Sequence, residues 1–168
     1  MSHSRIFQYS VKPIDKENYI GESDFWDDNA NGQSFHGEYC GDYLVERNEI
    51  ERFDDIKWLA MSLSKFNIKL EEEDKFVLGE GFRKAIQDFW YDGIEKCFEE
   101  LDKENLARYH ERWHLKYAIT DPLSGGFGFL FYSNEEQTLS ASDDFFEFLL
   151  RLNEGDAFYI GATLDYHC

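Results

Sequence analysis

The sequence predicts an α+β fold in which a mainly antiparallel sheet packs against three to four amphipathic helices. Short segments with alternating apolar side chains predict strands, and longer segments with apolar residues three and four apart predict helices. These segments follow one another irregularly and include a hairpin, without the repeated β-α-β units that build a parallel sheet. We expect one acidic α+β domain over residues 1–168, because a chain of this length suits one hydrophobic core and shows no internal repeat.

The first half of the chain predicts a strand, a helix and a hairpin. RIFQYSV alternates apolar and polar side chains and predicts a strand that Pro13 ends. Residues 14–38 are polar and rich in turn formers, and EYCGDYLVE fits either a short strand or the start of a helix. Apolar residues at helical spacing predict a helix over 49–66. The alternating segments NIKLE and KFVLG, on either side of residues 72–74, predict a hairpin.

The second half predicts three helices and two strands. The most regular apolar stripe runs over 81–101 and predicts a helix that packs along the core. Gly93 lies in its middle at a cost in helix stability, which suggests a close packing contact there. A shorter helix follows over 103–118, and GGFGFLFYS predicts a strand. Ser142 is expected to cap another helix, over 142–152, and AFYIGATLDY predicts the last strand.

Net charge is the most unusual property of the chain. It carries 35 acidic and 17 basic residues, a formal charge of −18. Residues 1–55 and 120–168 each carry −8, whereas 56–101 carry −3 and 102–119 carry +1. If the two ends fold onto one side, that face repels nucleic acid and anionic membranes and attracts basic proteins. We therefore expect a basic protein partner, no direct nucleic-acid binding and no membrane association. The alternative is that the charge only keeps the protein soluble.

The cysteines and the N-terminus indicate a cytoplasmic protein. Cys40, Cys97 and Cys168 are odd in number and widely spaced, without a C-x-x-C pair. The first residues hold no apolar signal core, and no segment approaches the roughly 18 apolar residues of a membrane span. A soluble protein in a reducing compartment fits these features. Cys97 falls on the apolar face of its helix and is expected to pack in the core.

One motif in the 103–118 helix has the spacing of a zinc site. His110 and His114 are four residues apart and share a helix face, with Glu111 between them. Two imidazoles in this arrangement can bind Zn²⁺ while the glutamate activates a water as general base. The five residues resemble the H-E-x-x-H motif of the zincins. The resemblance implies His110 and His114 as zinc ligands and Glu111 as the base of a small hydrolase.

The surroundings of the motif depart from the zincin pattern. Arg112 inside the motif and Lys116 beyond it are charged, whereas the zincin helix is buried and mostly uncharged around the motif. The third ligand would have to be Glu135 or Glu136, which falls in a polar loop and not on a helix. We therefore interpret the segment as a partly exposed amphipathic helix, and keep the zinc site as the alternative.

A second segment resembles the calcium loop of EF-hand proteins. DDNANGQSFHGE matches the spacing of that loop, with Asp27, Asn29, Asn31 and Glu38 at oxygen-ligand positions. Ser34 stands where the family has an apolar residue, and the chain holds no second loop to pair with. An acidic, turn-rich loop is the prediction, and a calcium site is its alternative.

The other candidate motifs do not indicate catalysis. Asp165 and His167 lie two residues apart on one face of the last predicted strand, and we interpret them as a solvated pair. The chain contains no P-loop, no G-x-S-x-G and no dinucleotide fingerprint. We therefore expect a protein that is not an enzyme and uses no cofactor.

These observations favour a non-catalytic acidic interaction protein, of the inhibitor or immunity type. Its basic partner would be a nucleic-acid-binding protein, a nuclease or a toxin, whose basic groove would accept carboxylates in place of phosphates. A small zinc-dependent hydrolase built on residues 110–114 is the alternative function. The predicted interaction surface consists of acidic residues from the two ends of the chain: Asp24, Asp27, Asp28, Asp54, Asp55, Glu135, Glu136, Asp143, Asp144, Glu154 and Asp156.

Overall fold

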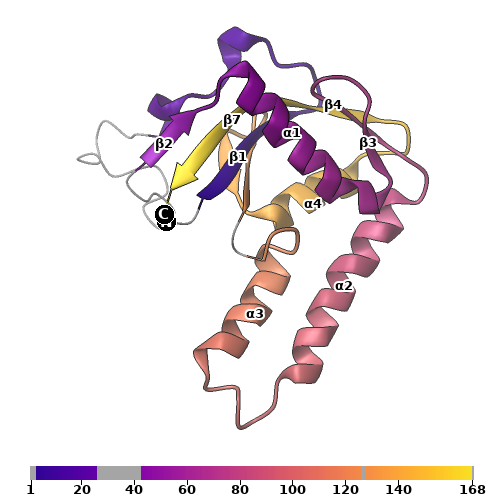
Figure 1. The fold of residues 1–168 in the computed structure, drawn as a ribbon. Helices are drawn as coiled ribbons and strands as arrows, with labels where there is room; N and C mark the ends of the chain where they lie inside the picture. The colour runs from indigo at the N-terminus through magenta and orange to yellow at the C-terminus, as the bar shows by residue number, and fades with distance from the viewer. Residues whose placement is uncertain (1–2, 26–42, 126–127, 168) are drawn as a thin grey trace.

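A computed structural model of the protein describes residues 3–25, 43–125 and 128–167 (Figure 1). Its strands are β1 (His3–Ser10), β2 (Tyr43–Glu46), β3 (Ile68–Leu70), β4 (Lys75–Leu78), β5 (Phe129–Ser133), β6 (Thr138–Ser140) and β7 (Ala157–His167). Its α-helices are α1 (Glu49–Leu63), α2 (Phe82–Glu100), α3 (Tyr109–Thr120) and α4 (Ser142–Arg151). Short 3₁₀ helices cover Lys16–Asn18, Glu22–Phe25 and Ser64–Phe66.

The α+β class is confirmed, but the prediction of a mainly antiparallel sheet was wrong, because the sheet is mixed. Its strand order is β3-β4-β7-β1-β5-β6, and β2 pairs with β7 beside β4. β1 runs parallel to β5, with Arg5 opposite Phe129 and Tyr9 opposite Ser133. The two strands are separated by more than a hundred residues, so no local pattern in the sequence announces their parallel pairing.

Strand β7 is the axis of the sheet. It runs antiparallel to β1 along one edge, and to β4 and β2 along the other. Its register with β1 shifts between two pairs: Phe7 lies opposite Thr163, whereas Tyr9 lies opposite Ile160. β7 therefore carries one extra residue at this point, which is a β-bulge, and such bulges bend the strand and increase its twist.

Two buried polar side chains, Gln8 and Arg52, form hydrogen bonds to the backbone of the bulge. Gln8 accepts a hydrogen bond from the backbone N–H of Ala162 at 3.0 Å. Arg52 of α1 donates to the carbonyl oxygens of Ile160 at 2.7 Å and Gly161 at 2.6 Å. A side chain at Gly161 would not fit, because its Cβ would lie 2.5 Å from the Gln8 Oε1 atom. The two side chains thus satisfy backbone groups at the bulge, where the regular ladder is interrupted.

Each face of the sheet carries its own apolar cluster. α1, α4 and the start of α2 cover one face, where the Phe131 and Phe145 rings stack with centroids 3.9 Å apart. On the other face, Ile20 and Phe25, which follow β1, are buried against the sheet. The side chains of the second cluster are Ile6, Ile20, Phe25, Leu44, Leu130, Leu139, Ala162, Leu164 and Tyr166.

Helix α1 begins at a complete capping box. The Asn48 side chain accepts hydrogen bonds from the backbone N–H groups of Ile50 at 3.0 Å and Glu51 at 3.1 Å, while the Glu51 carboxylate accepts from the Asn48 N–H. Helix α4 was expected to be capped by Ser142. Its N-cap is Ala141 instead, and the Ser142 hydroxyl donates to the Asp121 carboxylate at 2.5 Å. The serine therefore ties α4 to the end of α3.

Helices α2 and α3 form a hairpin, here called the arm, that extends away from the sheet (Figure 1). Only Phe82 and Ile86, in the first two turns of α2, are buried, and no residue of α3 is. The helix over 81–101 is confirmed, but its packing along the core over its whole length was not: Phe98 is 58% exposed. Cys97 is half-buried between the two helices and outside both core clusters.

None of the helices in the described part of the chain combines the length and the apolar character that crossing a membrane requires.

Candidate functional site

The predicted acidic residues divide into buried and exposed groups, and the neighbours Asp54 and Asp55 show the division. Both are on α1, but the Asp54 side chain is 69% exposed and that of Asp55 only 6%. The Asp55 side chain is therefore buried, whereas that of Asp54 is open to solvent. Successive residues of a helix point about 100° apart, which here directs one carboxylate to solvent and the other to the sheet.

Asp55 belongs to a buried ion cluster that joins β1, β7 and α1. Its carboxylate accepts hydrogen bonds from Arg5 Nε at 2.8 Å, from Arg47 Nε at 3.1 Å and from the Thr163 hydroxyl at 3.1 Å. Asp165 of β7 accepts from Arg5 and lies 3.9 Å from Arg47 Nη1. Each carboxylate thus faces both guanidinium groups, which is the arrangement that makes a buried charge tolerable.

Asp165 therefore has a structural role and is not solvated as predicted. Its side chain is 10% exposed and is committed to the ion cluster. The side chain of His167 lies outside what the structure describes, so the predicted pair is described only on its aspartate side.

Three of the predicted acidic residues gather around one hollow. Glu135 and Glu136 in the turn between β5 and β6, and Asp144 at the start of α4, line a cavity of about 320 Å³ together with Tyr9 and Phe148. We call this cavity the Tyr9 hollow. The pKa of Tyr9 is raised to about 12: burial is the largest cause, a hydrogen bond with Ser133 opposes the rise, and the charges of Glu136, Asp144 and Glu135 contribute to it. The negative charges of the three carboxylates therefore all act on the Tyr9 side chain.

The carboxylates of the hollow differ in how firmly they are held. Glu135 accepts hydrogen bonds from the Ser10 hydroxyl at 2.6 Å and the Val11 N–H at 3.0 Å, which fixes its orientation. Glu136 is 64% exposed and lies 3.6 Å from Arg151 Nη1. Arg151 is itself 66% exposed, so this ion pair is open to solvent and weak.

The other predicted acidic residues lie at turns and helix ends. Asp24 accepts from the Gly21 N–H at 2.6 Å, Glu154 from the Gly81 N–H at 2.8 Å, and Asp156 from the Asn153 N–H at 2.7 Å. Asp143 accepts from the Asp144 N–H at 3.0 Å; burial raises the pKa of Asp143, an effect that this hydrogen bond partly opposes. Asp27 and Asp28 lie outside the described residues.

The H-E-x-x-H segment forms the first turns of α3. The His110 and His114 rings are neighbours, with centroids 4.0 Å apart, and both residues are exposed. Glu111 is half-buried: one carboxylate oxygen lies 3.8 Å from Arg108 Nη1, and the other is buried without a hydrogen-bond partner among the described residues. In the parts of the chain that the structure describes, no three His, Cys, Asp or Glu side chains are grouped to hold a metal ion.

The other residues of the metal predictions lie elsewhere. Glu135, one candidate for a third zinc ligand, is hydrogen-bonded to Ser10 and Val11 at the end of β1. The predicted calcium ligands Asp27, Asn29, Asn31 and Glu38 all lie outside the described residues. The calcium site therefore stays a prediction.

Comparison with protein-family models, with curated proteins and with solved structures finds no match to this chain.

Sequence reasoning missed the residues that give the Tyr9 hollow its character. Tyr9 lies on the predicted strand β1, but only the parallel pairing with β5 brings it beside the turn that holds Glu135 and Glu136. Phe148 and Arg151 are on the predicted helix α4, four and seven residues after Asp144, which places all three along one side of that helix. This helical spacing is the one signal in the sequence that could have grouped them.

The ion cluster gives a matched test of the two neighbouring aspartates. Asp55→Asn removes a charge that faces two buried guanidinium groups, and we expect it to lower the free energy of unfolding by about 2–4 kcal/mol. Asp54→Asn removes the same charge from an exposed position and should change that energy by less than about 0.5 kcal/mol. Urea denaturation of both variants measures the difference, and equal effects would show that Asp55 is not part of a buried cluster.

The zinc alternative is tested by metal content. Two imidazoles alone make an incomplete site, so protein purified without a histidine tag should contain well under one zinc per chain and lose it on dialysis. One zinc per chain, lost in His114→Ala, would establish the zinc site and require a third ligand outside the described residues.

Proposed function

We propose that the protein is a non-catalytic acidic binding protein that engages a basic protein partner through the Tyr9 hollow. The observation that carries the proposal is the gathering of Glu135, Glu136 and Asp144 around one cavity with an aromatic floor. A partner's lysine or arginine would meet carboxylates at the rim and the Tyr9 and Phe148 rings below.

The electrostatics of the molecule support this proposal. A net charge of −18 gives an attractive field to any basic protein and speeds encounter at low ionic strength. Residues 120–168, which supply Glu135, Glu136 and Asp144, hold nine acids and a single base, Arg151. The same field disfavours nucleic acid, so the partner we infer is a protein with a basic groove, such as a nucleic-acid-binding protein, a nuclease or a toxin.

Arg151 supports the kind of contact that we propose. Its guanidinium lies 3.6 Å from a carboxylate oxygen of Glu136 and 3.6 Å from one of Glu147, and all three side chains are more than half exposed. A guanidinium is thus already accepted at the rim of the hollow. A partner's arginine could replace this solvent-exposed contact, because exposed ion pairs of this kind contribute at most about 1 kcal/mol.

Nucleic-acid mimicry is the mode of binding that we infer. The carboxylates of the hollow would take the places of phosphates in the partner's basic groove, which would make the protein an inhibitor or an immunity protein. The aromatic side chains would add apolar contact that phosphates do not offer, and aromatic residues are common among those that dominate binding energy.

The test compares variants with the same net charge. The double variant Glu136→Gln/Asp144→Asn should weaken capture of basic proteins from a lysate of the source organism, by roughly 2- to 30-fold for two contacts of up to about 1 kcal/mol each. The control, Glu71→Gln/Glu72→Gln in the turn between β3 and β4, removes two exposed charges elsewhere and should bind like the wild type. Captured proteins are identified by mass spectrometry at increasing salt.

Two outcomes would contradict this proposal. Capture of no basic protein at low salt would exclude a basic protein as the partner. Equal loss of capture in the two double variants would show that only net charge matters and that the Tyr9 hollow is not the site.

A further inference from the structure

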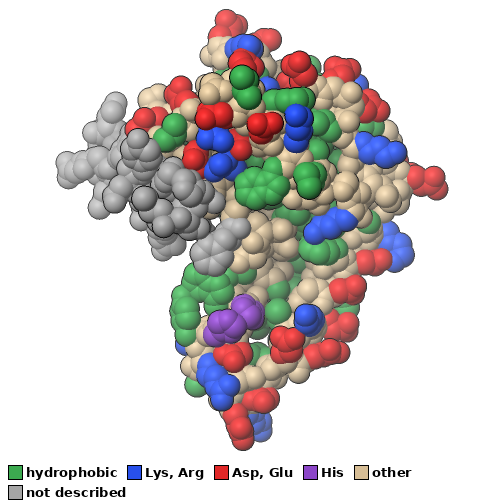
Figure 2. All heavy atoms as spheres, viewed as in Figure 1, with side chains coloured by type: hydrophobic (Ala, Val, Ile, Leu, Met, Phe, Trp, Pro, Cys, Tyr) green, Lys and Arg blue, Asp and Glu red, His purple; other side chains and the backbone are tan. Residues whose placement is uncertain are grey.

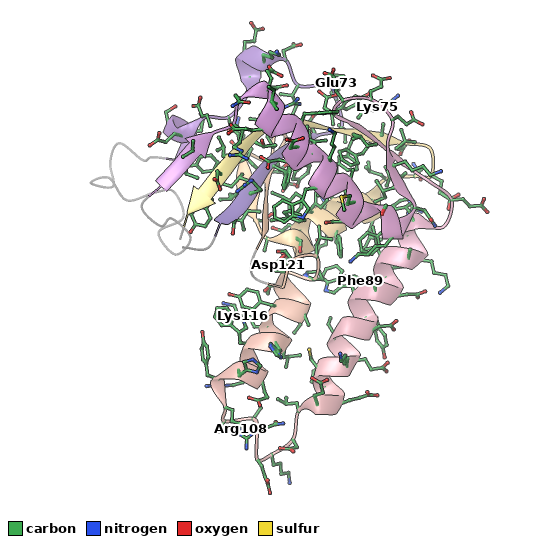
Figure 3. All side chains as sticks on the ribbon, in the orientation of Figure 1. Glu73, Lys75, Phe89, Arg108, Lys116 and Asp121 are labelled. Atoms are coloured by element: carbon green, nitrogen blue, oxygen red, sulfur yellow. The ribbon has the colours of Figure 1, made fainter. Side chains whose placement is uncertain are left out.

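A second cavity lies between α2 and α3 of the arm and is also lined by Asp121, Pro122 and Gly125, which follow α3. It measures about 500 Å³, within the range of roughly 300–1,000 Å³ that is typical of binding pockets. Trp90, Gly93 and Cys97 of α2 line one side, Tyr117 and Ala118 of α3 the other. Trp90 closes the end near the body, because its indole N–H donates to the Ile119 carbonyl at 3.1 Å. We call this cavity the arm groove; Phe89, labelled in Figure 3, lies on α2 at its body end.

Gly93 is the residue that needs explanation in this groove. It lies inside α2, where glycine lowers helix stability by about 1 kcal/mol relative to alanine. A Cβ at this position would meet no heavy atom within 4 Å among the described residues, and the backbone there is ordinary helix. The packing contact that the sequence suggested is therefore not made within the described part of the chain. A glycine in an apolar groove leaves room for another molecule to approach the helix backbone.

The charges along the groove are mostly acidic. Residues 88–100 of α2 hold five acids and one base, Lys96. Asp92 and Glu100 line the groove, and so does Lys96, which lies one helical turn from each of them. Arg112 and Lys116 of α3 are two residues before and after His114, roughly 200° around the helix, so they point away from the groove. Figure 3 labels Lys116 partway along α3 and Arg108 at the tip of the arm.

We propose that the arm groove binds a basic amphipathic helix of a protein partner. The apolar stripe of such a helix would fill the space between α2 and α3, with one of its turns against Gly93, and its lysines would face Asp92 and Glu100. Helix-in-groove binding uses apolar anchors at positions three, four and seven apart, which matches a groove running along two helices. The proposal rests on the proposed function only for the basic character of the partner, since the groove is a separate site.

Part of the apolar lining of the arm groove is exposed and could contact such a helix. Figure 2 shows apolar side chains scattered over the arm together with acidic and basic ones. Phe89, which lines the groove, is 36% exposed, whereas Tyr91 and Phe98 are 64% and 58% exposed on the other side of α2, outside the groove lining. A helix seated between α2 and α3 would turn the hairpin into a three-helix unit and bury apolar surface that two splayed helices leave open.

The test uses three synthetic peptides and isothermal titration calorimetry. The first peptide is a leucine–lysine helix with its leucines on one face. The second has the same composition in an order that destroys this face, and the third replaces the lysines with glutamates. The first should bind with a defined stoichiometry of one, and the other two should not. Equal binding of the first two would overturn the proposal, because charge alone would explain it.

Gly93→Leu locates the site without changing any charge. The leucine side chain would occupy the groove, so binding of the leucine–lysine helix should weaken by about tenfold or more. The melting temperature should not fall, since nothing lies within 4 Å of the new Cβ and leucine favours helix. Tyr91→Ala, on the other side of α2, is the matched control and should bind like the wild type. Unchanged binding by folded Gly93→Leu would overturn the proposal.

The two proposals fail separately. The Glu136→Gln/Asp144→Asn variant should bind the leucine–lysine helix as tightly as the wild type, because the Tyr9 hollow and the arm groove share no lining residue. Loss of peptide binding in this variant, with Gly93→Leu unaffected, would move the helix site to the hollow and leave the proposed function standing.

Discussion

The buried ion cluster of Arg5, Arg47, Asp55 and Asp165 is the interaction on which the arrangement of the body depends. Its members come from β1, the residue after β2, α1 and β7, so none of these elements can be placed without the others. An unpaired charge at any of these positions would cost several kcal/mol, whereas the complete set is tolerated. The cluster therefore gives specificity to the contact between α1 and the sheet, where apolar packing alone would permit sliding.

The bulge in β7, a few residues before Asp165, adds a second polar contact between α1 and the sheet. Arg52, one turn before Ile56 on α1, donates to two carbonyls at the bulge, and Gln8 accepts from the backbone N–H of Ala162 there. Helix α1 thus contacts β7 at two places, through Asp55 and through Arg52. These buried polar groups of the body hold the sheet together, and the two proposed binding sites lie apart from them, at the Tyr9 hollow and on the arm.

The sequence predicted the individual helices and strands better than the pairing and packing between them. The strands at β1 and β7, the β3–β4 hairpin and the helices α1, α2 and α4 follow from local periodicity and are confirmed. The parallel pairing of β1 with β5 and the bulge at Gly161 are set by contacts between distant residues, which no local pattern encodes. The stripe on α2 identified an apolar face but could not tell whether the protein itself covers it. Likewise, the charges of Asp54 and Asp55 are identical, and only the helix orientation separates their roles.

The division into a tightly constrained body and an incompletely packed arm is the central claim, and hydrogen–deuterium exchange of the backbone amides tests it most directly. Amides of β1 and β7 should exchange only through global unfolding. Amides of α3 and of α2 beyond Gly93 should exchange much faster in the free protein, and become protected when the leucine–lysine helix is bound. Equal protection of the arm and of β7 in the free protein would contradict the account.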